Sequence, residues 1–301
     1  MSIEIEDINY LYNILYEIMP RRTSNEVLSM DYLTFSAYIG DPNVAPGGWI
    51  TIKKLVDNSN INSKSNILDI GSNTGHSSFL LKMLTDAKVT GIDIRNDLVE
   101  ISKKICDYVD LNVDFICGDI KDMPFENKEF THIITTGTLA FLSNGHQKAL
   151  EEMHRVLVNN GVVIDTCLYY KIKPPEDVIK RASQKLESEL LNYDLNQYKE
   201  LYERCGFKLF NQVSMSEDYS DADINKVIDH ILYREEILCR EENMPIGEDY
   251  KLALKNRLTE TLTVFKENEN YLSGEILFFQ KMTKRAVCSL DSCCFYHTKY
   301  N

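Results

Sequence analysis

The chain has 301 residues and a formal net charge of −13, and 44% of its residues are hydrophobic. This composition supplies a large core and excludes an intrinsically disordered chain. The excess of acids argues against binding to nucleic acid, whose phosphates are held mostly by Lys and Arg. No apolar run is long enough to span a bilayer, and the acidic start MSIEIEDINY lacks the basic region of a secretory signal. We therefore expect a cytoplasmic protein that does not bind membranes and whose cysteines are reduced.

The first 64 residues predict a helical N-terminal cap. Apolar residues at helical spacing predict a helix over residues 5–19, and shorter helices are expected at 24–32 and 49–57. Between the last two, the segment GDPNVAPGG at residues 40–48 is typical of a loop, because Pro and Gly interrupt it twice.

From residue 65 onward, runs rich in Ile and Val alternate with helical stretches. The expected strands are 66–70, 88–94, 113–117, 131–135 and 162–167, and the expected helices are 75–84, 97–108 and 147–157. This alternation is typical of an α/β protein in which helices cover both faces of a parallel sheet. We assign residues 65–216 and 273–284 to this core, with further strands at 207–215 and 275–282.

Residues 217–272 predict an acidic helical insertion. Residues 217–271 contain 14 acidic and 7 basic residues, so this stretch carries over half of the net charge. We expect it to form a lid, its acids either solvated or facing a bound molecule. Residues 285–301 form a tail in which Cys288, Cys293, Cys294 and His297 lie close together. Their spacing does not match that of zinc sites, so we expect no metal there.

The most informative motif is ILDIGSNTGHSS at residues 67–78, where a strand runs through a Gly-rich turn into a helix. Such a turn lets a ligand approach the backbone, and the helix start offers N–H groups to an anion. The turn lacks the middle glycine of the dinucleotide fingerprint G-x-G-x-x-G, and Asp69 would repel a diphosphate. A dinucleotide-dependent oxidoreductase is therefore disfavoured.

Two further acids follow strands of the same sheet. Asp93, in GIDI, ends the second strand, where a carboxylate can accept from both hydroxyls of a ribose. Asp119, in CGDI, follows the third strand, where it can accept from an exocyclic amine such as that of adenine. The alternative interpretation of Asp69 and Asp93 is that each caps a helix or turn.

The order of ILDIGSNTG, GIDI, GDIKDMPFENKEFTHII and ALEEMHRVLVNNGVVI resembles the class I S-adenosylmethionine-dependent methyltransferases, in particular the ubiquinone- and menaquinone-biosynthesis branch. The resemblance covers about residues 66–168. It implies a Rossmann-like, doubly wound sheet of seven strands, whose last strand is antiparallel and lies between strands five and six. It also implies S-adenosylmethionine as cofactor. The residues that it assigns to cofactor binding are Asp69, Gly71, Ser72, Asn73, Gly75, His76, Asp93, Ile94, Asp119, Ile120 and Thr136.

The residues that handle the acceptor are less well marked. His146 begins the helix after the fourth strand and is the best-placed histidine for a general base. Tyr169 and Tyr170 follow the fifth strand, Tyr169 as a candidate catalytic residue and Tyr170 as a candidate acceptor contact; packing under the lid is the alternative for both. Tyr38 and Trp49 flank the loop at 40–48 and are candidate acceptor contacts.

We therefore expect methyl transfer to an N, O or C nucleophile of a small, neutral or cationic molecule. Two alternatives remain open. One is a methyltransferase that acts on a peptide or protein, and the other is a non-catalytic S-adenosylmethionine-binding regulatory protein. The sequence leaves the oligomeric state unassigned.

Overall fold

The computed structural model describes residues 14–15, 17–19, 23–39, 47–142, 144–190, 192–215, 224–241 and 247–282. Most of the helix expected at 5–19, most of the loop at 40–48 and the whole cysteine-containing tail lie outside these residues. The part of the first helix that is described is helical, and it buries Ile14 and Leu15.

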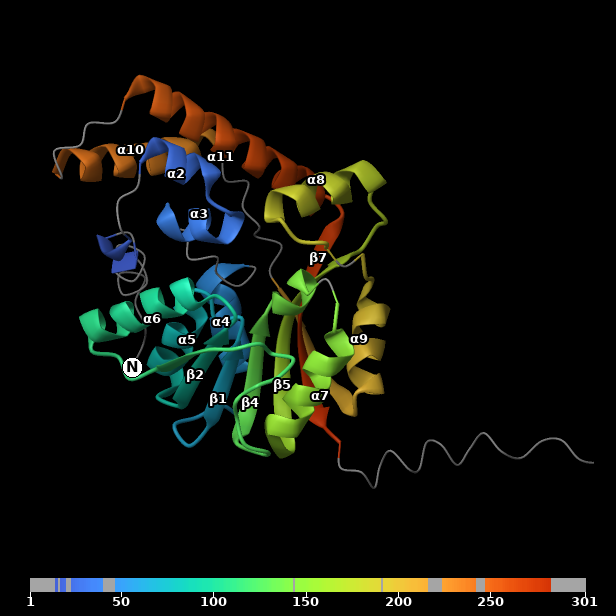
Figure 1. Ribbon diagram of the computed structural model, residues 1–301. Coiled ribbons are helices and arrows are strands. Elements are labelled where there is room, and N and C mark those ends of the chain that lie inside the picture. Colours follow the sequence, from blue (N-terminus) through green and yellow to red (C-terminus); the bar gives the residue numbers. More distant parts are fainter. Residues whose placement is uncertain are drawn as a thin grey trace, which may run out of the picture.

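One sheet of seven strands runs through the core (Figure 1). The strands are β1 (Asn66–Ile70), β2 (Lys88–Asp93), β3 (Asp114–Cys117), β4 (Phe130–Thr136), β5 (Leu157–Tyr170), β6 (Phe207–Ser214) and β7 (Leu272–Lys281). Their order is β3-β2-β1-β4-β5-β7-β6, and β7 is antiparallel to both of its neighbours. The expected topology is thereby confirmed, including the place of the last strand between the fifth and the sixth.

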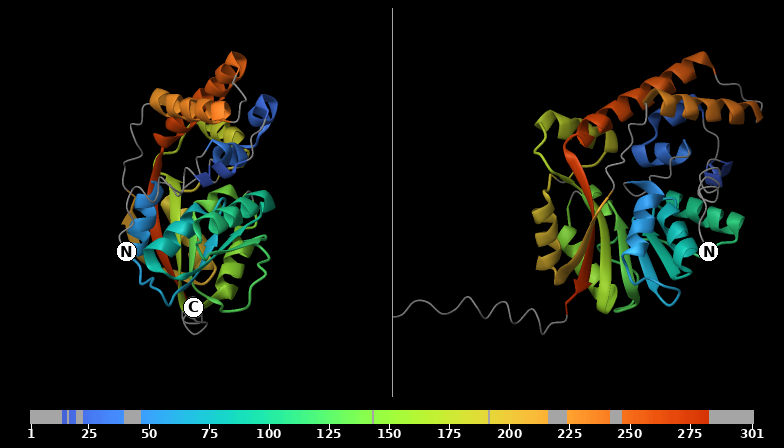
Figure 2. Two further views of the ribbon diagram at one scale, coloured as in Figure 1. Left: turned by 90° about the vertical axis from the view of Figure 1, so that its left-hand side faces the viewer. Right: turned by 180° about the vertical axis from the view of Figure 1, so that it is seen from behind.

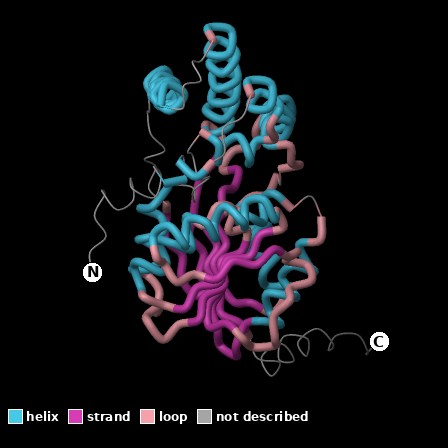
Figure 3. Tube along the Cα trace, turned by 60° about the vertical axis from the view of Figure 1, so that its left-hand side comes forward, coloured by secondary structure: helices cyan, strands magenta, loops and turns pink. Residues whose placement is uncertain are grey.

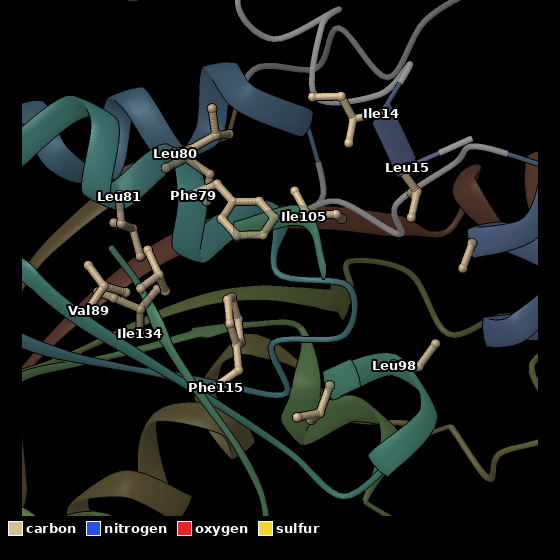
Figure 4. Packing of buried hydrophobic residues seen from close by; sticks show 14 of the residues in the cluster. Ile14, Leu15, Phe79, Leu80, Leu81, Val89, Leu98, Ile105, Phe115 and Ile134 are labelled. Carbon is tan, nitrogen blue, oxygen red and sulfur yellow. The ribbon is translucent and has the colours of Figure 1, made fainter. Parts of the chain in front are cut away.

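Helices cover both faces of the sheet (Figure 3). One face carries α4 (Gly48–Asp57), α5 (His76–Thr85) and α6 (Asn96–Val109), and the other carries α7 (His146–Val156) and α9 (Leu195–Arg204). Each helix turns an apolar stripe inward, as Ile52 and Leu55 of α4 illustrate, because both are buried. On the α5 face, the rings of Phe79 and Phe115 point toward each other and pack edge-to-face, with centroids 5.5 Å apart (Figure 4).

A second group of helices lies beyond the carboxyl ends of the parallel strands (Figures 1 and 2). These helices are α2 (Ser24–Ser29), α3 (Tyr32–Tyr38), α8 (Glu176–Leu186), α10 (Ile224–Glu241) and α11 (Glu248–Glu269). We call this group the cap. The long helix α11 packs against α2, α8 and α10, and so joins three separate stretches of sequence.

The cap differs from the expected division of the chain in two places. Helix α4 packs on α5 against the sheet, so residues 1–64 are not one cap. Helix α8, which the sequence places in the core segment 65–216, packs instead on α11. Both helices are amphipathic, and such a pattern predicts that a face is buried without showing which partner buries it. No helix among the described residues is long and apolar enough to cross a membrane.

Candidate functional site

The loop between β1 and α5 is fixed to the end of β2 by its own backbone. The N–H groups of Gly71 and Ser72 donate to the Ile92 carbonyl at 2.9 and 3.1 Å, and that of Asn73 donates to Asp93 Oδ2 at 2.8 Å. These three N–H groups are therefore used inside the protein rather than offered to a ligand. Asn73 adopts positive φ (48°), which asparagine tolerates well.

The loop is tight enough that glycine is required. At Gly71, with φ of 69°, an added Cβ would lie 2.2 Å from Thr138 Oγ1, whose hydroxyl donates to the Ile70 carbonyl. At Gly75, with φ of 87°, it would lie within 2.7 Å of both Phe79 and Phe115. The sequence alone does not mark Thr138, because its role depends on the fold bringing the η1 turn (Thr138–Phe141) beside the loop.

Asp69 lies beneath the loop rather than in it. Its side chain is completely buried, and its Oδ2 accepts from Ser78 Oγ at 2.6 Å. Burial raises the pKa of Asp69 to about 7, and the hydrogen bond from Ser78 opposes this effect only in part. This arrangement agrees with the alternative interpretation, in which Asp69 holds the start of α5. A direct contact with the cofactor stays a prediction.

Asp93 holds the loop and the next turn together. Its Oδ2 accepts from the Asn73 N–H, and its Oδ1 accepts from the Arg95 N–H at 2.9 Å. A carboxylate has about four lone-pair positions, so about two remain for further donors such as hydroxyl groups. Burial raises the pKa of Asp93, and the two backbone donors oppose that rise. Asp93 therefore caps a turn while keeping the capacity to bind a ligand.

Several side-chain oxygens of this loop have unused hydrogen-bonding capacity. Ser72 Oγ, Asn73 Oδ1 and Thr74 Oγ1 are buried and have no hydrogen-bond partner among the described residues. Buried polar atoms are rarely left so, because an unmade hydrogen bond costs about 1–3 kcal/mol. Next to them, the apolar side chain of Ile94 is 66% exposed. These oxygens are therefore candidates for hydrogen bonds to a bound molecule.

Asp119, Ile120 and Thr136 complete the expected set. Asp119 Oδ1 accepts from the Lys121 N–H at 2.8 Å and its carboxylate is partly exposed, whereas Ile120 is buried in the core on the α7 face. Thr136 ends β4 beside Thr166 of β5. The structure brings Asp93, Asp119 and the loop to the same carboxyl edge of the sheet, as the sequence analysis expects.

The histidines differ in what they can do. His76 is buried at the start of α5, and burial lowers its pKa to about 3, so its ring is neutral at neutral pH. His146 begins α7, and its Nε2 lies 3.0 Å from the Leu139 carbonyl. Because a carbonyl only accepts, Nε2 must carry the proton, and Nδ1 has the free lone pair of a base.

The tyrosines and Trp49 are packed to different degrees. The Tyr170 hydroxyl donates to Asn268 Oδ1 of α11 at 3.0 Å and the residue is buried, so its packing role is the one that the structure favours. Tyr169 is half-buried against the core on the α7 face. Tyr38 is buried in α3, and Trp49 is half-buried in α4. Their roles as acceptor contacts stay predictions.

The cap contains a cleft of about 460 Å³ among α2, α3, α8 and α11. Tyr32 and Phe35 line it together with the ion pair formed by Lys185 and Glu260, whose atoms are 2.7 Å apart. The side chain of Glu260 is 66% exposed and that of Glu248 is 89% exposed, so these two acids of α11 belong to a solvated surface. Among the described residues, no cluster of three or more His, Cys, Asp or Glu is placed to hold a metal ion.

Comparison with known proteins agrees with this geometry. A family model described as a methyltransferase domain matches residues 67–161, the stretch that holds the loop, Asp93 and Asp119. The chain carries a class I S-adenosylmethionine-dependent methyltransferase domain. The cofactor of this family is S-adenosylmethionine.

Curated relatives match the methyltransferase domain over part of their length. Arsenite methyltransferase of Homo sapiens is 32% identical over 123 residues, which are 37% of this chain and 33% of that protein. Demethylmenaquinone methyltransferase of Staphylococcus epidermidis is 29% identical over 117 residues, which are 37% of this chain and 46% of that protein. The match thus spans between a third and a half of each relative's length.

Among solved structures, the MccD protein superposes with a TM-score of 0.66 over 79% of this chain and 99% of that one. Its sequence is 22% identical, so the likeness concerns the fold. The shared fold therefore extends well beyond residues 67–161, the stretch matched by the family model.

Proposed function

We propose that this protein transfers a methyl group from S-adenosylmethionine to an N, O or C nucleophile of a small neutral or cationic molecule. The observation that carries the proposal is the loop at residues 71–75, where buried side-chain oxygens without partners lie beside Asp93 and the exposed Ile94. The second support is the cap, which lies over the same edge of the sheet, where a small acceptor would be enclosed (Figure 2).

When bound, S-adenosylmethionine would supply a methyl group activated by its sulfonium, with the sulfur as the leaving group. The protein's part is binding, orientation and proton removal. Asp93 would accept from the ribose hydroxyls, and Asp119 from the adenine amine. The cap excludes water, and His146 Nδ1 is the candidate that receives a proton from an acceptor hydroxyl or acidic carbon.

The first test is titration of the full chain with S-adenosylhomocysteine, the demethylated product, by isothermal calorimetry. We expect saturable binding with a stoichiometry of one. Lack of binding at high micromolar ligand would overturn the proposal. If the ligand binds, a second experiment measures transfer of a labelled methyl group into a small-molecule extract and, separately, into a peptide mixture. It distinguishes a small-molecule acceptor, a peptide acceptor and a non-catalytic binding protein. Label in peptides alone identifies a peptide acceptor, and label in neither pool indicates a non-catalytic binding protein.

Replacing His146 tests its role as the base. If the acceptor found in that screen is a hydroxyl, we expect His146→Gln to lower kcat about 100-fold, because general-base catalysis contributes roughly 10² to 10⁴. The affinity for S-adenosylhomocysteine should stay within about twofold. His154→Gln is the matched control, since His154 lies on the same helix with its ring against Phe207. Equal turnover of the two variants with a hydroxyl acceptor would remove His146 from the mechanism.

A further inference from the structure

Arg95 contacts both the candidate ribose-binding acid and the cap. Its backbone N–H donates to Asp93 Oδ1 at 2.9 Å, just before α6 begins. Its guanidinium reaches α3, where Nη1 and Nη2 lie 3.0 and 3.3 Å from the two oxygens of Asp31, and Nη2 lies 2.7 Å from Thr34 Oγ1. One residue therefore joins the end of β2 to the cap by hydrogen bonds at both of its ends.

The cap side of this contact is held by further hydrogen bonds. Asp31 is the N-cap of α3, and its Oδ1 accepts from the Thr34 N–H at 3.0 Å. Partial burial acts to raise the pKa of Asp31, but the hydrogen bonds from Arg95 and Thr34 outweigh it and lower the pKa to about 2. The carboxylate is therefore ionised at neutral pH, and the pair keeps both of its charges.

The core side of the contact is equally defined. Arg95 also pairs with Asp97 in the first turn of α6, with Nε 2.9 Å from Oδ1 and Nη2 2.7 Å from Oδ2. Asp97 thus binds the guanidinium from the core side, whereas Asp31 binds it from the cap side. The two carboxylates have the same chemistry, and only Asp31 belongs to the cap.

The rest of the cap is attached at the other side of the sheet. Arg257 of α11 donates to the Val27 and Met30 carbonyls at 2.6 Å and stacks over Phe35, so α2 and α3 are held to α11. The chain passes from β5 toward α8 and from α11 into β7, so the covalent connections of α8 and α11 lie beside β5 and β7 (Figure 1). The Arg95–Asp31 pair lies beside β2, away from those connections.

We propose that Arg95 is a positioning residue that couples occupancy of the cofactor loop to closure of the cap. A ligand that bonds to Asp93 fixes the backbone from which Arg95 projects, and Arg95 then holds α3 over the site. Because coupling between two sites is reciprocal, closing the cap raises the affinity for the cofactor by the same factor. This inference rests on the proposed function.

Hydrogen–deuterium exchange of the full chain, with and without saturating S-adenosylhomocysteine, tests the coupling without an acceptor. In the wild type we expect the ligand to slow exchange over residues 24–38 about tenfold, within the range of typical coupling factors. Asp31→Asn, which keeps an N-cap residue, should abolish this slowing while ligand still binds. Asp97→Asn is the matched control and should retain it. If the contact were purely structural, Asp31→Asn would change the exchange rate equally with and without ligand. The ratio of these two rates would then stay as in the wild type.

Arg95→Lys gives a second measurement if Asp31→Asn fails to fold. It keeps the positive charge but loses the two-pronged contact, and we expect the same loss of the ligand effect. Ligand binding with unchanged exchange over residues 24–38, or an equal effect in Asp31→Asn and Asp97→Asn, overturns the coupling and leaves the proposed function intact. Failure of the wild type to bind S-adenosylhomocysteine overturns both.

Discussion

Asp93→Ala is expected to weaken binding of S-adenosylhomocysteine about 100-fold or more. The change removes the acceptor for two ribose hydroxyls, and hydrogen bonds to a charged group contribute roughly 1.5–3 kcal/mol each. It also leaves the Asn73 and Arg95 N–H groups without their acceptor, which loosens the loop itself. Calorimetric titration at pH 7.5 measures the effect, with thermal unfolding as the check that the variant is folded.

Asp114→Ala is the matched control for this experiment. It removes the same charge from the first residue of β3, where the side chain is exposed, and should leave the affinity within about twofold. Wild-type affinity in Asp93→Ala would show that Asp93 only caps the turn, as the alternative interpretation holds. Asp119 would then replace Asp93 as the leading candidate for the cofactor-binding acid.

The second large effect is on stability rather than on binding. Asp165, in the middle of β5, is buried and accepts from the Tyr202 hydroxyl at 3.0 Å. Burial raises the pKa of Asp165 to about 7, as it does for Asp69. In the unfolded chain an aspartate has a pKa of 3.8 and is ionised above that pH. In the folded chain Asp165 stays protonated until about pH 7. Each group therefore makes its full contribution to the free energy of unfolding below pH 4. This contribution falls by up to about 4 kcal/mol as the pH rises to 7.

Asp165→Asn should remove one of these two contributions, because asparagine still accepts from Tyr202 and does not ionise. We expect the stability advantage of the variant over the wild type to be small near pH 5 and to grow by a few kcal/mol up to pH 8. Urea unfolding at pH 5, 6, 7 and 8 measures this, with Asp114→Asn as an exposed control. Parallel pH profiles for the wild type and Asp165→Asn would show that Asp165 does not titrate in this range. Affinity for S-adenosylhomocysteine should not change, since Asp165 faces α9 rather than the loop.

The local parts of the site could be predicted from the sequence, because its strand-end acids and Gly-rich loop follow their strands within a few residues. Asp93 and the loop lie together for this reason. Contacts between distant residues could not be predicted. Arg95 and Asp31 are 64 positions apart, and Arg257 and Val27 are 230 apart. Hydrophobic spacing also leaves open which surface each helix covers, as the packing of α4 on α5 and of α8 on α11 shows.

The composition of the cap from three separate stretches has a consequence for folding. Its helices meet only after chain segments up to 230 residues apart have been brought together. Closing such long loops costs conformational entropy before any contact between the helices can offset that cost. The methyltransferase domain, by contrast, builds most of its sheet from neighbouring strand–helix units. The cap should therefore form late and open first, as a unit of low local stability on a firmer base. Substitutions that change which acceptor binds would then fall in the cap, where local opening is already frequent, and would leave the cofactor loop intact.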